Sequence, residues 1–93
     1  MRKSDVPSFK DTLGWIEYLR GDYKSATDLL EQAAVALPNN AIVQYHLGMS
    51  YLGSGQFAKA SEQFKKALAL GPDSALQQKI ETVVNTHFVP SGK

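Results

Sequence analysis

The sequence contains no cysteine, which excludes disulfide bonds, thiol chemistry and thiolate metal sites and leaves the redox compartment open. No apolar run approaches the roughly 18 residues that a membrane helix needs, so we expect no insertion into a membrane. The formal net charge is only +1, so charge gives no broad argument for a nucleic acid or an acidic membrane surface as partner. We therefore expect a soluble protein that binds neither.

A secretory signal is also missing from this chain. Basic residues stand at its start, but Ser4, Asp5 and Pro7 occupy positions where a signal peptide has apolar residues. We expect either a cytoplasmic protein or a leader that lies outside this chain.

Residue patterns for catalysis are equally sparse. The two histidines, His46 and His87, lie far apart, and neither has metal-ligand spacing with a second histidine. No serine or aspartate stands in an arranged nucleophile motif, and no strand pattern exists to support one. The segment 53–55 has the glycines of a phosphate-binding loop but lacks its lysine. The sequence therefore predicts no enzyme, no catalytic residue, no metal and no cofactor.

What the chain does contain is an internal repeat. At 93 residues and 43% apolar composition it can form one small core. A step of 34 positions relates similar residues over about sixty positions. The first set is Leu13, Gly14, Gly21, Tyr23, Ala26, Leu30, Ala33 and Pro38, and the second is Leu47, Gly48, Gly55, Phe57, Ala60, Phe64, Ala67 and Pro72. A period of this length is typical of stacked helical hairpins.

Apolar spacings of three and four residues predict helices over 9–20, 23–37, 41–52, 56–70 and 74–86. Ser4 or Ser8 is the expected cap of the first helix, the segment Pro38-Asn39-Asn40 supplies the cap of the third, and Asp73 can cap the fifth. The fifth helix departs from the repeat and carries one apolar stripe, formed by Leu76, Ile80, Val83 and Val84. We expect it to close the open end of the stack.

Gly14 and Gly48 lie inside predicted helices, where glycine is less favourable than alanine by roughly 1 kcal/mol. Close contact between helices would offset this difference. We expect Ala26 and Ala60 to face the two glycines and to let the backbones approach, while Leu13, Leu47, Leu30 and Phe64 fill the remaining volume.

These positions resemble those of the tetratricopeptide repeat. The resemblance covers about three-quarters of the chain and implies an all-α fold, a right-handed α-solenoid. It implies one domain over 1–93, with repeat 1 at 7–40, repeat 2 at 41–74 and a capping helix at 75–88. The chain departs from the family at Lys10 and Gln44, where a large aromatic residue is common, and at Glu17, where tyrosine is common.

The order of residues in the repeats, including Trp15 after Gly14 and Tyr45 before Leu47, is also similar to that in the C-terminal repeats of large bacterial repeat proteins. Some of those proteins belong to exopolysaccharide export and envelope assembly. This resemblance implies a bacterial scaffold in the cytoplasm or periplasm, and a chain that forms part of a longer solenoid.

The first helix of each unit carries a second apolar stripe, separate from its packing face. In tetratricopeptide repeats this stripe lines a concave groove that holds a peptide or helix of a partner protein. The predicted groove residues are Asp11, Trp15, Tyr18, Leu19, Ile42, Tyr45, His46, Met49 and Leu52. Tryptophan and tyrosine often anchor such contacts. The basic and amide residues of the family's carboxylate clamp are absent from this stripe, so we do not expect an adaptor for chaperone tails.

Two functions are therefore open. The first is a non-catalytic module for protein–protein interaction that uses this groove. The second is a self-assembly segment in which the stripe packs on a second copy or on neighbouring repeats. Trp15 could contact a partner molecule, or it could be covered by the cap helix, a neighbouring repeat or a second copy of the chain. Met49 and Leu52 fit ordinary core packing beside the fifth helix.

Overall fold

The computed structural model describes residues 6–88, and this part of the chain folds into five helices. They are α1 (Val6–Leu19), α2 (Tyr23–Ala36), α3 (Ala41–Gly53), α4 (Phe57–Ala69) and α5 (Ser74–His87). The predicted all-helical repeat stack is confirmed. Most predicted boundaries agree within two residues, and the largest difference is the start of α1.

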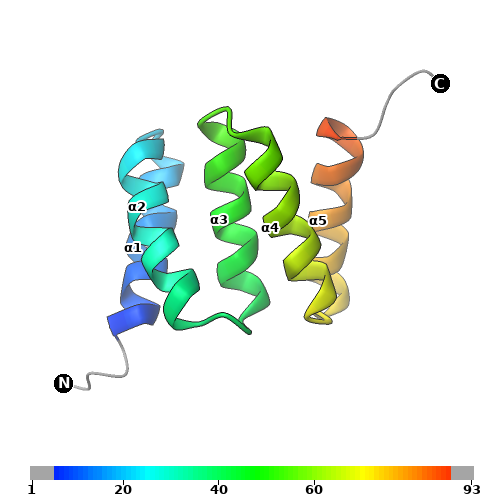
Figure 1. Ribbon diagram of the computed structural model, residues 1–93, viewed down its shortest axis with the longest axis horizontal. Coiled ribbons are helices and arrows are strands. Elements are labelled where there is room, and N and C mark those ends of the chain that lie inside the picture. Colours follow the sequence, from blue (N-terminus) through cyan, green and yellow to red (C-terminus); the bar gives the residue numbers. More distant parts are fainter. Residues whose placement is uncertain (1–5, 89–93) are drawn as a thin grey trace.

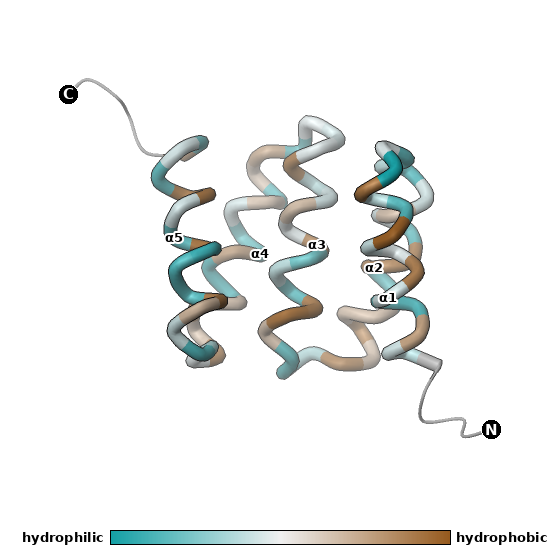
Figure 2. The backbone as a smooth tube through the Cα atoms, turned by 180° about the vertical axis from the view of Figure 1, so that it is seen from behind, coloured by the Kyte–Doolittle hydropathy of each residue, from teal (hydrophilic) through white to brown (hydrophobic). Residues whose placement is uncertain are grey.

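The helices form consecutive hairpins in an elongated stack of 52 × 28 × 18 Å (Figure 1). α1 pairs with α2 and α3 with α4, while α2 packs against α3 and α5 against α4. Seen from behind, α1, α3 and α5 lie on the near side (Figure 2). Each hairpin thus contacts only its neighbours, as in other repeat arrays.

The helix starts are set by short polar side chains. Asn40 accepts hydrogen bonds from the backbone amides of Ile42 and Val43 at 3.0 and 3.2 Å, and Asp73 accepts from Leu76 at 2.9 Å. Both predicted caps are confirmed. The prediction for Ser8 is wrong because this residue lies within α1, and Ser4 lies outside the described residues. Asp22, which the sequence analysis did not single out, caps α2 through the Ser25 amide.

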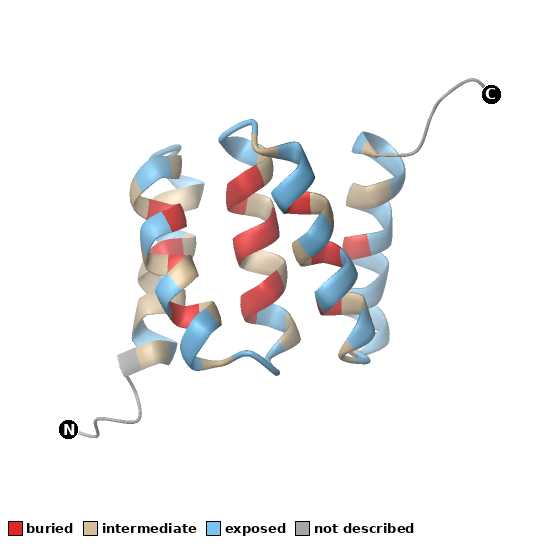
Figure 3. Cartoon of the chain, in the orientation of Figure 1, coloured by how far each residue is buried: buried red, intermediate tan, exposed pale blue. Residues whose placement is uncertain are grey.

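The core runs along the facing sides of the helices and follows the repeat (Figure 3). Its members come mainly from equivalent positions of the two units and are Ala26, Leu30, Leu47, Tyr51, Ala60, Phe64, Ala67 and Ile80. The predicted stripe of α5 faces this core, with Ile80 fully buried. The remaining surface of α5 is mostly exposed and polar, as a terminal helix requires.

Close contact at the two helical glycines is confirmed. A Cβ atom on Gly48 would lie 2.6 Å from the Phe64 ring, and one on Gly14 would lie 2.7 Å from Leu30 Cγ. Leu30 and Phe64 therefore fill the volume beside the glycines, as expected, and Ala26 and Ala60 are fully buried on the partner helices.

Gln44 replaces the aromatic residue that is common in the family by making hydrogen bonds. It is 1% exposed, and its Nε2 lies within 3.3–3.5 Å of the carbonyl oxygens of Ala34, Leu37 and Pro38. The side chain of Gln63 donates to its Oε1. Carbonyl groups at a helix end lack partners within the helix, so Gln44 ties the end of α2 to α3 and α4.

A buried hydroxyl pair also joins the two repeats. Thr27 of α2 and Ser50 of α3 lie 2.7 Å apart, and Ser50 is fully buried. Within residues 6–88, every buried side-chain nitrogen and oxygen has a hydrogen-bond partner. The junction between the repeats is thus partly polar, with its hydrogen bonds satisfied.

We expect Gly48→Leu to lower the free energy of unfolding by about 1–3 kcal/mol, because the new side chain would enter the space of the buried Phe64 ring. Thermal unfolding followed by circular dichroism measures this effect. Ala58→Leu, on the exposed side of α4, is the matched control and should leave the melting temperature almost unchanged. An equal melting temperature for Gly48→Leu and the wild type would contradict the packing described.

Tyr51 gives the stability a pH dependence. Its hydroxyl donates to Glu31 Oε2 at 2.7 Å, and burial, together with this carboxylate, raises the pKa of Tyr51 above its ordinary value of 10.0. Above about pH 10 the unfolded chain loses this proton while the folded chain keeps it, so stability falls as pH rises. We expect Tyr51→Phe to lose less stability than the wild type between about pH 8 and about pH 11. Urea unfolding at both pH values tests this, and equal losses would be the contrary result.

Candidate functional site

Asp11, Trp15 and Tyr18 of α1 and Tyr45 and His46 of α3 form one group, here called the aromatic cluster. Asp11 Oδ1 and His46 Nδ1 lie 2.8 Å apart, and each side chain is 14% exposed. Trp15 stacks on Tyr18 and on His46, with ring centroids separated by 4.6 and 4.2 Å. The structure therefore brings five of the nine predicted groove residues together.

Tyr45 connects the aromatic cluster to the core. Its ring lies 6.1 Å from Trp15 and 6.3 Å from the buried Phe64. Burial raises the pKa of Tyr45, and burial with the neighbouring Tyr23 and Tyr45 raises the pKa of Tyr18. Both phenols therefore stay neutral at physiological pH and can donate hydrogen bonds.

The other four predicted groove residues have different surroundings. Met49 and Leu52 are partly buried and pack against the core. Leu19 is 66% exposed, and Ile42 is 51% exposed. Ile42 lines a cleft with Tyr45 and His46, whereas Leu19 lines none of the clefts described below.

An open cleft runs between α3 and α5 and is here called the α3–α5 cleft. One part has a volume of about 230 Å³ and is lined by Ile42, Tyr45, His46, Asp73, Ala75, Leu76 and Lys79. A second part of about 510 Å³ is lined by Tyr45, Ala75, Gln78, Lys79, Thr82 and Val83. Tyr45, Ala75 and Lys79 line both parts, so the cleft extends along α5.

The wall that α5 contributes was missed by the sequence analysis. Ala75, Gln78, Lys79 and Thr82 recur at spacings of three and four, which places them on one helix face. This spacing was the available signal, but only the packing of α5 shows that the face borders Tyr45.

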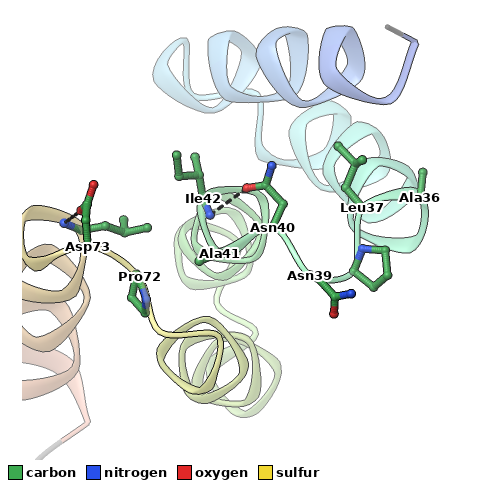
Figure 4. Close-up of a pocket in the computed structure, with 10 residues that line it drawn as sticks. Ala36, Leu37, Asn39, Asn40, Ala41, Ile42, Pro72 and Asp73 are labelled. Atoms are coloured by element: carbon green, nitrogen blue, oxygen red, sulfur yellow. Dashed lines mark hydrogen bonds between the residues drawn. The ribbon is translucent and has the colours of Figure 1, made fainter. Parts of the chain in front are cut away.

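A larger hollow of about 600 Å³ lies at the base of the stack, between the loops that precede α3 and α5 (Figure 4). Asn40 and Asp73, two of its polar side chains, already cap these helices through Ile42 and Leu76. The hollow shares Ile42, Asp73 and Leu76 with the first part of the α3–α5 cleft, but no residue of the aromatic cluster lines it, and these two polar groups serve the fold. We therefore place the candidate site at the aromatic cluster and the α3–α5 cleft.

Neither feature has the make-up of a metal centre. Among residues 6–88, no three or more His, Asp or Glu side chains are grouped so that they could hold a metal ion. The same part of the chain contains no helix long and apolar enough to cross a membrane.

We expect His46→Ala to weaken the aromatic cluster, since it removes a stacked ring from Trp15 and the contact with Asp11. The free energy of unfolding should fall by about 1 kcal/mol, and acrylamide should quench Trp15 fluorescence more strongly. His87→Ala is the matched control because His87 is exposed at the end of α5. Identical quenching in the two variants would contradict this description of the cluster.

The fold and the spacing of the core agree with one known family. A sequence model of the tetratricopeptide repeat matches residues 18–82, which is more than half of the chain. No functionally curated protein matches it. Tetratricopeptide repeats generally mediate protein–protein interactions and are typically non-catalytic. The chain belongs to the tetratricopeptide repeat family.

Proposed function

We propose that the aromatic cluster and the α3–α5 cleft together bind a peptide or helix of a partner protein. The observation that supports this most directly is the position of Tyr45, which belongs to the cluster and lines both parts of the cleft. An elongated ligand could therefore contact α1, α3 and α5 at once. In this proposal 7–40 and 41–74 are the two repeats of a single domain, and 75–88 closes it.

The aromatic cluster is preorganised for such a contact. The Trp15 ring is held in place because it stacks on Tyr18 of α1 and on His46 of α3. A side chain that is already ordered loses little freedom on binding, and so more of its contact energy stabilises the complex. Trp15 and Tyr45 are therefore the proposed anchors.

The lining of the cleft suggests the chemistry of the ligand. Ile42 and Leu76 offer apolar contact, and Lys79 adds a positive charge to both parts. The Asp11 carboxylate already lies against His46, which weakens its attraction for a basic ligand. We propose a segment with an apolar side chain followed by an acidic one, carried by a protein of a bacterial assembly.

The test is a selection of random peptides against the wild-type chain. We expect Tyr45→Ala to weaken binding of the selected peptides at least about tenfold, which is the effect of losing a hot-spot residue. Trp15→Phe, which keeps a ring in the cluster, should weaken binding less. Affinity is measured by titration calorimetry, after circular dichroism has shown that each variant stays helical.

Phe57→Ala is the control, because Phe57 is 56% exposed on α4, outside the cleft and the aromatic cluster. It should bind the selected peptides as the wild type does. The proposal would fail if the Phe57 variant lost as much affinity as the Tyr45 variant, or if both bound normally.

A further inference from the structure

Three large apolar side chains on α1 are exposed along one line. Phe9, Ile16 and Leu19 are 64%, 44% and 66% exposed, and Thr12 lies among them. At about 100° per residue, these four positions fall within about 80° of the helix circumference. They are here called the outer strip. α1 is on the near side in Figure 2, with hydrophobic stretches along it.

The second repeat shows what happens to the same face when a neighbour is present. The equivalents of Phe9 and Ile16, 34 residues later, are Val43 at 2% and Ser50 at 0% exposure. Ser50 is covered by α2, whose Thr27 hydroxyl lies 2.7 Å away. In this fold, that face of a first helix is thus a packing face, and on α1 it carries larger apolar side chains than on α3.

The spacing of the outer strip matches a helix as its occupant. Positions 9, 12, 16 and 19 are separated by three, four and three residues, which is the a and d pattern of a coiled-coil seam. The pattern is symmetric about its midpoint. An antiparallel copy of α1 would therefore set Phe9 opposite Leu19 and Thr12 opposite Ile16, and the same pairs would repeat across a two-fold axis.

Outside the aromatic cluster and the α3–α5 cleft, the described surface offers no second apolar face that could pair with the strip. The other large exposed apolar residues, Val35, Ile42 and Phe57, lie on three different helices. The free side of α5 is polar. Head-to-tail stacking of copies would therefore bury the strip against polar groups, whereas contact of the strip with itself would not.

We propose that a second copy of this chain covers the outer strip, with α1 packed antiparallel on α1 across a two-fold axis. Charge agrees with this direction. Among the described positions Arg20 is the charged residue nearest to the strip in angle, and the antiparallel arrangement places the Arg20 side chains of the two copies at opposite ends of the interface. The opposed helix dipoles also favour antiparallel packing.

The size of the outer strip sets the expected affinity of the dimer. α1 has 14 residues and is about 21 Å long, too small for the roughly 800 Å² per partner of a stable standard interface. We therefore expect a weak dimer with a Kd between about 10 µM and about 1 mM. This contact uses a different face from the α3–α5 cleft and does not depend on the proposed function.

Sedimentation equilibrium of the 93-residue chain over this concentration range is the test. The average mass of the wild type should rise from monomer toward dimer. Ile16→Glu should remain monomeric at every concentration. Val35→Glu is the matched control, since Val35 is 82% exposed on α2, and it should dimerise as the wild type does.

A second measurement covers the case in which the Ile16 variant loses its helical structure. The chain has no cysteine, so Thr12→Cys introduces a unique thiol on the strip, and Ala58→Cys introduces one on α4. A short bis-maleimide should join two copies through position 12 and not through position 58. A wild-type monomer throughout, or cross-linking that is equal at both positions, would overturn the proposal and leave the strip to a different helical partner.

Discussion

The contact between Gly48 and the Phe64 ring is the constraint on which the second hairpin and the candidate site depend. Without a Cβ on Gly48, the ring can lie against α3 and become completely buried. From this position Phe64 lies 6.3 Å from Tyr45 and 6.1 Å from Phe88. The same ring thus supports the aromatic cluster on one side and the end of α5 on the other. Gly14 and Leu30 form the equivalent contact in the first hairpin.

The stacking of the two repeats is fixed by polar as well as apolar contacts. The Thr27–Ser50 pair and the hydrogen bonds of Gln44 are directional, and their groups are buried at the junction. Sliding one hairpin along the other would leave these groups without partners, which is more unfavourable than a shift between apolar surfaces. This junction therefore sets the distance between α1 and α3, where Asp11 meets His46. The aromatic cluster is a product of that register.

Much of the fold and part of the candidate site could be predicted. Apolar spacings of three and four residues placed the five helices of the described chain, and apolar side chains at equivalent positions of the two repeats formed the core as expected. The second stripe assigned Trp15, Tyr18 and Tyr45 to one groove, and the structure places their three rings in one cluster. Two features could not be predicted, namely the capping role of Gln44 and the wall formed by α5. Each depends on which side chain of a different helix fills a given space, and a period along one chain carries no information about that.

The sequence by itself determined where the helices begin and end, which faces turn inward and that the units stack, because helical spacing, caps and glycines act over a few residues. Only the tertiary structure decided that His46 reaches Asp11 and Trp15, that the polar face of α5 borders Tyr45 and that the outer strip of α1 stays uncovered. The contacts of His46 with Asp11 and Trp15, and of α5 with Tyr45, join residues more than twenty positions apart. They arise from the angle and register at which hairpins pack, and those are set by the fit of all the buried side chains together.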